Sequence, residues 1–366
     1  MSIGECQSKC AHLSGIPLYP QVAQLLHRIY LAKGVAATTA IEGNTLSENQ
    51  VLQQIDGKLE VPPSQEYLKQ ENDNIIRACN LILKQVKQKN PPPISVEHIK
   101  KLNRRVLNKL QLPSPDIVPG EIRQYSVGVG NYRGAPADEC EYLLKRLCDW
   151  LNGPEFLPTP GMEIAFAIIK AIVAHLYIAW IHPFGDGNGR TARLLEFQIL
   201  LCSGVPSPSA QLLSNHYNLT RNEYYRRLDS ARRAILEFLE YSIEGFKDGL
   251  RDQINMVQSQ QLNIAWINYV YEQFERLHGT PHERRKNLIL DLSDSPSPVA
   301  LSELRQLSPR VAVAYKDLHH RTLVRDIANL LQMGLITSGK DGKWRAKKEV
   351  MLEFFAAKVN VESDIV

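Results

Sequence analysis

A glycine-rich stretch directly after the most apolar run of the chain constrains the fold most strongly. Residues 163–181 are apolar, with Lys170 and His175 as interruptions, and this predicts a buried core helix rather than a membrane span. The next residues read His182-Pro-Phe-Gly-Asp-Gly-Asn-Gly-Arg-Thr-Ala-Arg193. We expect a new helix to begin inside this stretch, near Asn188. The sequence therefore predicts a loop held between two core helices.

The backbone of this loop is suited to bind an anion. Gly185, Gly187 and Gly189 permit backbone angles that turn successive N–H groups toward one point. At a helix N-terminus, these groups and the helix dipole together attract negative charge. Arg190 and Arg193 lie three residues apart and therefore share a helix face, and guanidinium groups bind phosphate through paired hydrogen bonds. The pattern predicts a polyphosphate site.

Two further side chains add reaction chemistry to that site. One carboxylate together with phosphate oxygens and waters is the usual arrangement around Mg²⁺, so Asp186 is a candidate metal ligand; an aspartate in a turn can also simply cap the next helix. His182 precedes a proline, which places it in extended or turn geometry. Because imidazole titrates near neutral pH, His182 can accept a proton from a hydroxyl group.

The stretch matches the signature of the Fic (filamentation induced by cAMP) family, His-Pro-Phe-x-[Asp/Glu]-Gly-Asn-Gly-Arg, and the chain resembles that family over most of residues 1–250. The resemblance implies transfer of AMP from ATP to a Ser, Thr or Tyr hydroxyl of a target protein, with Mg²⁺ as cofactor and pyrophosphate as leaving group. The target could be the protein itself. Glycine at position 189 favours adenylylation, because the Doc-like kinase branch of the family has lysine there.

The resemblance also implies a role for each residue of the signature. His182 would deprotonate the target hydroxyl, and Asp186 would hold Mg²⁺. Three residues at the start of the second helix, Gly187, Asn188 and Gly189, would hold the α-phosphate. Arg190 would hold the phosphate chain and Arg193 the γ-phosphate.

An upstream segment, Thr38 to Asn44, resembles the inhibitory pattern of the family, [Ser/Thr]-x-x-x-Glu-[Gly/Asn]. Glu42 could pair with Arg193, which would leave ATP bound with its α-phosphate out of line for attack. A displacement of about 1 Å can slow a reaction by ~10²-fold. Taken alone, glutamate before glycine is also a common helix end. The resemblance predicts self-inhibition within one chain.

Two other segments resemble parts of a Fic site. Gly120 to Gly130 resembles the flap, a hairpin whose exposed edge could pair with the backbone of a target, although an ordinary hairpin would fit these residues equally well. Four residues of this region would lie beside the nucleotide: Val129, Gly130, Asn131 and Tyr132. The rings of Tyr224 and Tyr225 could stack on adenine, with core packing as the alternative. Arg232 is a weaker nucleotide candidate.

The remaining pattern predicts a mostly α protein: a Fic-type helical domain with a short β-hairpin flap, plus a C-terminal winged-helix domain. We expect an N-terminal helical region with the inhibitory motif at 1–90, a catalytic core at 91–250, and a linker helix with the winged helix at 251–366. Helices are predicted at about 19–51, 67–87, 95–110, 137–152, 163–180, 194–203, 222–240 and 244–274, with an extended segment at 122–129.

The last hundred residues suggest two short helices, 302–307 and 322–333, followed by a strand pair near Gly334 and Trp344. This module could bind DNA, dock protein targets, or serve as a structural or dimerising unit; DNA binding is the least favoured. Its candidate DNA contacts are His320, Arg321, Arg325, Lys340, Lys343 and Arg345.

Composition bounds the remaining choices. A net charge of +4 does not by itself imply nucleic-acid binding. The first residues lack a basic segment followed by an apolar run, so we expect no secretory signal, no membrane partner and a cytoplasmic protein whose six cysteines are reduced. A homodimer that shields Glu42 is an option.

Two alternative functions stay open: a hydrolase that removes AMP, with Glu42 positioning water, and a DNA-binding regulator that only senses nucleotide.

Overall fold

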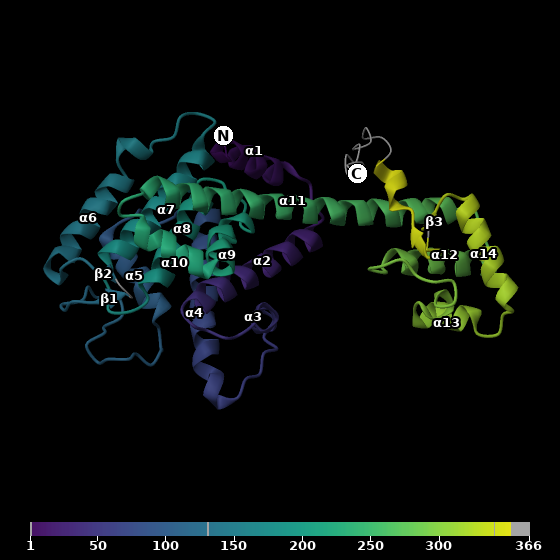
Figure 1. The fold of residues 1–366 in the computed structure, drawn as a ribbon, viewed down its shortest axis with the longest axis horizontal. Coiled ribbons are helices and arrows are strands. Elements are labelled where there is room, and N and C mark those ends of the chain that lie inside the picture. The colour runs from purple at the N-terminus through teal and green to yellow at the C-terminus, as the bar shows by residue number, and fades with distance from the viewer. Residues whose placement is uncertain (1, 130–131, 340, 353–366) are drawn as a thin grey trace, which may run out of the picture. The chain divides into compact units, whose positions relative to one another are not determined.

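The computed structural model describes residues 2–129, 132–339 and 341–352, and Figure 1 shows a fold built almost entirely of helices. Among the described residues it has fourteen α-helices and two small antiparallel sheets. The predicted mostly α fold is confirmed. The chain divides into two compact units, Met1–Ile254 and Asn255–Val366. A separate boundary near residue 90 stays a prediction.

The first unit contains ten complete helices among its described residues, the start of an eleventh, and one hairpin. These are α1 (Ser2–Gly15), α2 (Pro20–Ile41), α3 (Glu48–Ile55), α4 (Glu66–Lys87), α5 (Val96–Val106), β1 (Gly128–Val129), β2 (Tyr132–Arg133), α6 (Cys140–Leu151), α7 (Glu163–Ile181), α8 (Asn188–Cys202), α9 (Leu212–Leu219), α10 (Arg221–Ser230) and α11 (Ile235–Phe274), which ends in the second unit.

Helices α7 and α8 form the centre of this unit and pack along each other. Helix α7 is long and apolar enough to cross a membrane, yet 67% of that apolar segment is buried inside the unit, as is typical of a core helix. Helix α8 is buried along nearly its whole length, because α2, α4 and α5 also pack against it. The loop 182–187 joins these two helices, so both of its ends are fixed by core packing.

Local signals explain where several helices begin and end. The Ser95 hydroxyl accepts a hydrogen bond from the backbone N–H of His98 and caps α5. Helix α2 ends at Ile41, and Gly43 follows with φ 103°, a left-handed conformation that glycine adopts without strain. The prediction of one helical segment over 19–51 was therefore wrong: the glycine separates α2 from α3.

Other boundaries also differ from the predictions. Helix α8 begins at Asn188 and runs unbroken to Cys202, where the sequence suggested a further helix from 194. A turn at 231–234 separates α10 from α11, where one helix over 222–240 was expected. Helices α1 and α9 were not predicted. Helix α1 lacks a strong apolar stripe and buries two small side chains, Cys6 and Cys10.

The second unit adds α12 (Thr280–Ser293), α13 (Pro309–Tyr315), α14 (His320–Gln332), β3 (Ile336–Ser338) and β4 (Trp344–Ala346) to the end of α11. The expected helix over 302–307 was wrong, since only a 3₁₀ turn at Leu304–Gln306 forms there. The Ser308 hydroxyl instead caps α13. The helix near 322–333 and the strand pair are present as α14 and the β3–β4 hairpin. The winged-helix assignment stays a prediction.

All six cysteines are free thiols, and no disulfide forms in the described part of the chain; only Cys202 is exposed. Burial raises the pKa of Cys6, Cys10 and Cys79 to about 12 in each case. These three thiols are therefore protonated at neutral pH and act as small apolar side chains.

The contact between α7 and α8 should dominate the stability of the first unit. Leu195 on α8 is fully buried, so Leu195→Ala should lower the free energy of unfolding by about 2–5 kcal/mol, through lost transfer energy and a residual cavity. Leu236 is 75% exposed, and Leu236→Ala should change the free energy of unfolding by less than about 0.5 kcal/mol. Urea unfolding of both variants and the parent, followed by tryptophan fluorescence, measures the difference; equal losses in the two variants would contradict this packing.

Candidate active site

His182 lies at the junction between α7 and the loop. Its backbone is left-handed (φ 50°, ψ 57°), and its N–H still donates to the carbonyl of Ile178 at 2.9 Å. The ring Nδ1 lies 3.3 Å from the carbonyl oxygen of Ala179. A carbonyl can only accept, so Nδ1 carries the proton in this contact and Nε2 keeps its lone pair.

The surroundings favour the neutral form of this imidazole. Burial lowers the pKa of His182, and the positive charge of Arg123 lowers it further. The bond to Ala179 and the carboxylates of Glu42 and Asp186 act in the opposite direction but do not reverse the shift. His182 is therefore an unprotonated base at neutral pH.

The loop after His182 is held by a side-chain clamp. Asn188 Oδ1 accepts a hydrogen bond from the N–H of Phe184 at 3.0 Å, and its Nδ2 donates to the carbonyl of Phe184 at 2.8 Å. Phe184 itself is buried. Both polar groups of the Asn188 side chain are therefore occupied. The side chain therefore holds the loop, and its second Nδ2 hydrogen is not used by these two bonds. The predicted contact of Asn188 with the α-phosphate stays a prediction.

Asn103 on α5 braces the same loop and was missed by the sequence analysis. Its Nδ2 donates to the carbonyl of Asp186 at 2.9 Å, and its Oδ1 accepts from the N–H of Gly120 at 2.9 Å. Gly187 is left-handed (φ 74°), and a Cβ there would lie 3.1 Å from Asn103 Nδ2. The predicted helix over 95–110 gave no signal for this contact, because an asparagine on an amphipathic helix is usually a surface residue.

Glu42 and Arg193, which are 151 positions apart in the sequence, meet in the structure. Arg193 donates from Nη2 to Glu42 Oε1 at 2.6 Å, from Nε to Thr38 Oγ1 at 2.7 Å, and from Nη2 to the Thr38 carbonyl at 3.0 Å. Burial alone would raise the pKa of Glu42, but the charges of Arg193 and Arg190 outweigh it, so the pKa lies below the usual value. The pair is therefore ionised at neutral pH.

The Glu42 carboxylate also lies over the first turn of α8. A Cβ at Gly189 would lie only 2.4 Å from Glu42 Oε1, so glycine is required for this close approach. The first N–H groups of a helix have no partner within the helix and attract negative charge. Glu42 therefore lies where an anion bound at this helix end would also lie.

Arg190 is held by two carboxylates. Its Nη1 lies 2.5 Å from Glu71 Oε1 and its Nη2 lies 3.0 Å from Asp186 Oδ1, while Asn44 Nδ2 donates to Glu71 Oε2 at 2.9 Å. Burial raises the pKa of Glu71, although Arg190 lowers it in part. No sequence pattern marks Glu71 as a site residue, because a glutamate near the start of a predicted helix is a common surface residue.

The two tyrosines assigned to adenine have different environments. Tyr224 is buried, its ring stacks on Tyr217 with 4.8 Å between centroids, and its hydroxyl lies 2.9 Å from His175 Nε2. The prediction that Tyr224 stacks on the base is therefore wrong for this conformation; it is a core residue. Tyr225 is half-exposed, and its hydroxyl donates to the Ile41 carbonyl at 3.1 Å, beside Glu42. Arg232 lies exposed in the turn after α10.

The flap is shorter than predicted. Strands β1 and β2 pair Gly128 with Arg133 and Val129 with Tyr132. Gly130 and Asn131 lie outside the described residues, as do the side chains of Val129 and Tyr132, so their predicted contacts with nucleotide stay predictions.

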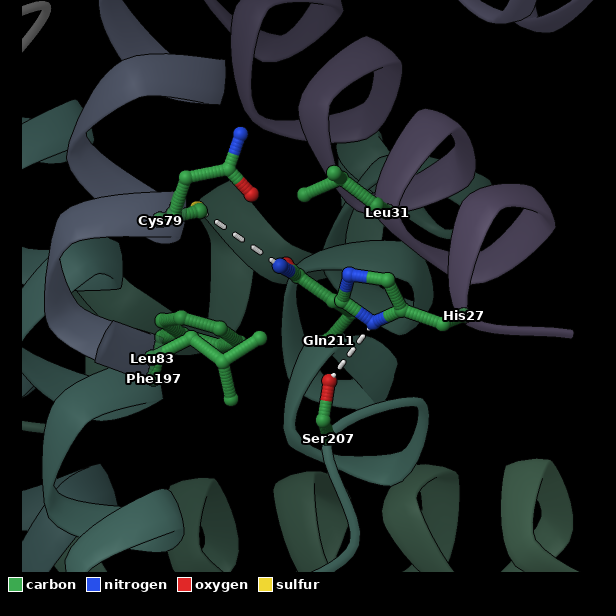
Figure 2. A pocket seen from close by; sticks show the side chains of 8 residues that line it. His27, Leu31, Cys79, Leu83, Phe197, Ser207 and Gln211 are labelled. Atoms are coloured by element: carbon green, nitrogen blue, oxygen red, sulfur yellow. Dashed lines mark hydrogen bonds between the residues drawn. The ribbon is translucent and has the colours of Figure 1, made fainter. Parts of the chain in front are cut away.

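Helix α2, which leads to Glu42, is anchored to the core at its other end. Figure 2 shows a small pocket where α2, α4 and α8 meet, with His27 Nδ1 2.9 Å from Ser207 Oγ and Gln211 Nε2 donating to Cys79 Sγ at 3.6 Å. A Cβ at Gly34 would lie 2.2 Å from Gln211 Oε1, so α2 approaches this segment closely. The position of Glu42 is therefore set by a packed helix rather than by a loose loop.

The residues present fit a nucleotide with its metal. No group of three His, Cys, Asp or Glu side chains gathers within the part of the chain that the structure describes. A metal at Asp186 would therefore need phosphate oxygens to complete its shell, as Mg²⁺ commonly does. Arg190 Nε is buried with no hydrogen-bond partner among the described residues. A phosphate oxygen is an acceptor of the kind that this donor lacks.

The basic residues proposed to contact DNA fall into two groups, exposed side chains on α14 and side chains near β4 that have acidic neighbours. His320, Arg321 and Arg325 are exposed on α14. Arg345 on β4 pairs with Glu349, and Lys343 lies 4.0 Å from Asp341. Lys340 lies outside the described residues. Two of the basic side chains proposed for the wing thus have acidic neighbours, which reduces their attraction for DNA phosphates.

The chain shares sequence with known proteins over its central part. Residues 93–200 match the Fic/DOC family. The chain is 30% identical over 228 residues to protein adenylyltransferase fic-1 of Caenorhabditis elegans, which covers 62% of this chain and 42% of that protein. It is 27% identical over 274 residues to the protein of the same name from Caenorhabditis briggsae, covering 72% and 48%. It thus spans less than half the length of these relatives.

Solved structures share the fold over a longer part of the chain. A fragment of Fic-1 from C. elegans superposes with a TM-score of 0.57 at 26% identity, covering 71% of this chain and 72% of that one. A Fic family protein from Desulfovibrio desulfuricans covers 94% and 96% with a TM-score of 0.53, and at 18% identity it shows the fold alone. The segment that matches the Fic/DOC family, residues 93–200, contains α5 to α7, most of α8 and the whole loop described above.

Proposed function

We propose that this protein is an adenylyltransferase that moves AMP from ATP to a hydroxyl group on a Ser, Thr or Tyr side chain of a target protein. The observation that carries the proposal is the loop 182–188. It joins a neutral imidazole with an available Nε2 lone pair to the first N–H groups of a buried helix, which have no partner within that helix. The names of the matched relatives support this activity.

In the proposed reaction, His182 Nε2 takes the proton of the target hydroxyl while its oxygen attacks the α-phosphorus. The bond from that phosphorus to the bridging oxygen breaks, and pyrophosphate leaves. The N–H groups of Gly189 and Arg190 would stabilise charge on the α-phosphate oxygens. Arg193 would bind the γ-phosphate. Mg²⁺, which we expect Asp186 to hold, would neutralise charge on the departing pyrophosphate.

We further propose that the described conformation is self-inhibited. The Glu42 carboxylate occupies Arg193 and lies against Gly189, so a triphosphate would compete with it for both. Tyr225 adds a hydrogen bond at the end of α2 and would help hold Glu42 in place. Removal of AMP from a modified target, with Glu42 positioning a water, is a second candidate function; the place of this carboxylate over the start of α8 favours it.

Glu42→Gly should raise the rate of transfer. It frees Arg193 and clears the first turn of α8, so we expect an increase on the order of 10²-fold in label transferred from α-³²P-ATP to protein in a lysate. Glu42→Gln keeps the shape but loses the ionic part of the bond, and should give an intermediate rate. Transfer by Glu42→Gly no faster than the parent would contradict self-inhibition. If the protein is instead a hydrolase, the same variant should lose its ability to remove AMP.

His182→Ala, made in the Glu42→Gly background, should remove the base and spare the binding site. We expect the transfer rate to fall by about 10²–10⁴-fold while the Kd for ATP, measured by calorimetry, stays within about twofold. Label transfer that persists in this variant at the parent rate would exclude His182 as the base.

The dependence of the transfer rate on pH should follow the titration of His182 and not that of the Glu42–Arg193 pair. Because the folded pKa of His182 lies below its ordinary value of 6.5, the base form is fully present above neutral pH and is lost as the pH falls through that lowered pKa. The pKa of Glu42 is also lowered, so its pair with Arg193 persists over the range where His182 titrates. Transfer by Glu42→Gly should therefore be flat at neutral and higher pH and decline only below the ordinary imidazole pKa of 6.5, and acid should not activate the parent. A rate that rises toward acidic pH in the parent would contradict this assignment.

A further inference from the structure

A buried arginine outside the signature connects the flap to the proposed base. Arg123 is 3% exposed and lies in the segment that leads into β1. Its Nε donates to the carbonyl of His182 at 2.7 Å, and its Nη2 lies 3.4 Å from the carbonyl of Ile181. Its backbone N–H donates to the carbonyl of Pro183 at 3.0 Å. One residue thus contacts three consecutive carbonyl groups at the end of α7.

The same guanidinium group binds both ends of the flap. Nη1 donates to the carbonyl of Tyr125, before β1, and Nη2 donates to the carbonyl of Ala135, after β2, each at 2.5 Å. Gly134 packs between Arg123 and His182, because a Cβ at this glycine would lie 3.1 Å from Arg123 Nη2 and 3.2 Å from His182 Cβ. The base of the flap and the proposed catalytic loop are therefore fixed to one rigid, planar group.

The carbonyl groups at the end of α7 explain why a cation is favourable at this position. The last carbonyl groups of a helix have no N–H partner within the helix and carry partial negative charge. His182 turns left-handed and Pro183 has no N–H to donate, so the helix cannot continue and supply backbone donors to the carbonyls of Ile181 and His182. Among the described residues, no carboxylate forms an ion pair with Arg123. Backbone carbonyls are the acceptors that satisfy this buried guanidinium group.

We propose that Arg123 is a positioning residue that sets the distance and angle between His182 and the flap on which the target would dock. This inference rests on the proposed function, because it assigns His182 as the base. Arg123 contacts neither Arg190 nor Arg193, the residues expected to bind the phosphates. Its loss should therefore slow transfer without weakening the binding of ATP.

The charge of Arg123 gives a second effect that a purely structural role would not produce. The groups that shift the titration of His182 are Arg123, which favours the neutral ring, and Glu42 and Asp186, which favour the charged ring, together with the bond to Ala179 and burial. Removing the Arg123 charge should raise the titration midpoint of His182. Replacing Arg123 with lysine keeps a charge but supplies compact donors instead of the fork that reaches both sides of the flap.

The test compares Arg123→Lys, Arg123→Met and Arg104→Met, all in the Glu42→Gly background. Arg104 is a matched control, because it is an exposed arginine near the same segment that contacts the Pro119 carbonyl and Glu121 but not the loop. We would measure kcat, KM for ATP and for a protein target, the Kd for ATP, and the midpoint of His182 by NMR of histidine labelled at Cε1. Thermal unfolding checks that each variant is folded.

We expect Arg123→Met to lower kcat by about tenfold or more, with the Kd for ATP unchanged and the His182 midpoint moved to higher pH. Arg123→Lys should lower kcat without moving the midpoint, and Arg104→Met should change neither. If Arg123→Met does not fold, the lysine variant still tests the proposal. Folded Arg123→Lys with the same kcat as the Glu42→Gly protein would overturn it. So would an unmoved midpoint in folded Arg123→Met. Absence of transfer activity in the Glu42→Gly protein would refute the proposed function. The NMR titration needs no turnover, so the His182 midpoints would still test the role of Arg123.

Discussion

The clamp between Asn188 and the backbone of Phe184 is the interaction on which the rest of the site depends. Two hydrogen bonds close a short loop whose ends are fixed by α7 and α8, the two most buried helices of the first unit. This closure turns the first N–H groups of α8 toward one point, with His182 at the other end of the loop. A buried amide with both of its groups paired is rigid, because breaking either bond would leave an unsatisfied polar atom in the core.

Around that clamp, the unit buries an unusual amount of charge in one place. Arg193 with Glu42, and Arg190 with Glu71 and Asp186, give two guanidinium groups whose partners are carboxylates. Burying such charges is costly, and it is tolerated when each group is paired and hydrogen-bonded. A triphosphate brings its own negative charge and could replace these partners. In the self-inhibition that we propose, carboxylate and phosphate would compete for the same arginines.

The sequence predicted where the signature residues lie, in one loop and at the start of one helix, because their spacing fixes that relation; their roles stay predictions. It also paired Glu42 with Arg193, through the inhibitory pattern. It failed where a residue acts through distant partners. Tyr224 was assigned to adenine, yet its ring is buried against Tyr217. Glu71, Asn103 and Arg123 each lie on another segment, and no local pattern distinguishes them from surface residues.

By itself, the sequence determined that the protein is mostly helical, that an apolar helix leads into a glycine-rich loop, and that a histidine, three glycines, an aspartate and two arginines lie close together there. These properties depend on periodicity and on residues close together in the chain. Only the tertiary structure decided that Glu71 faces Arg190, which ring is buried, and which guanidinium group links the flap to His182. The reason is physical: these contacts join segments up to 119 positions apart, and their strength comes from burial, which no local sequence pattern records.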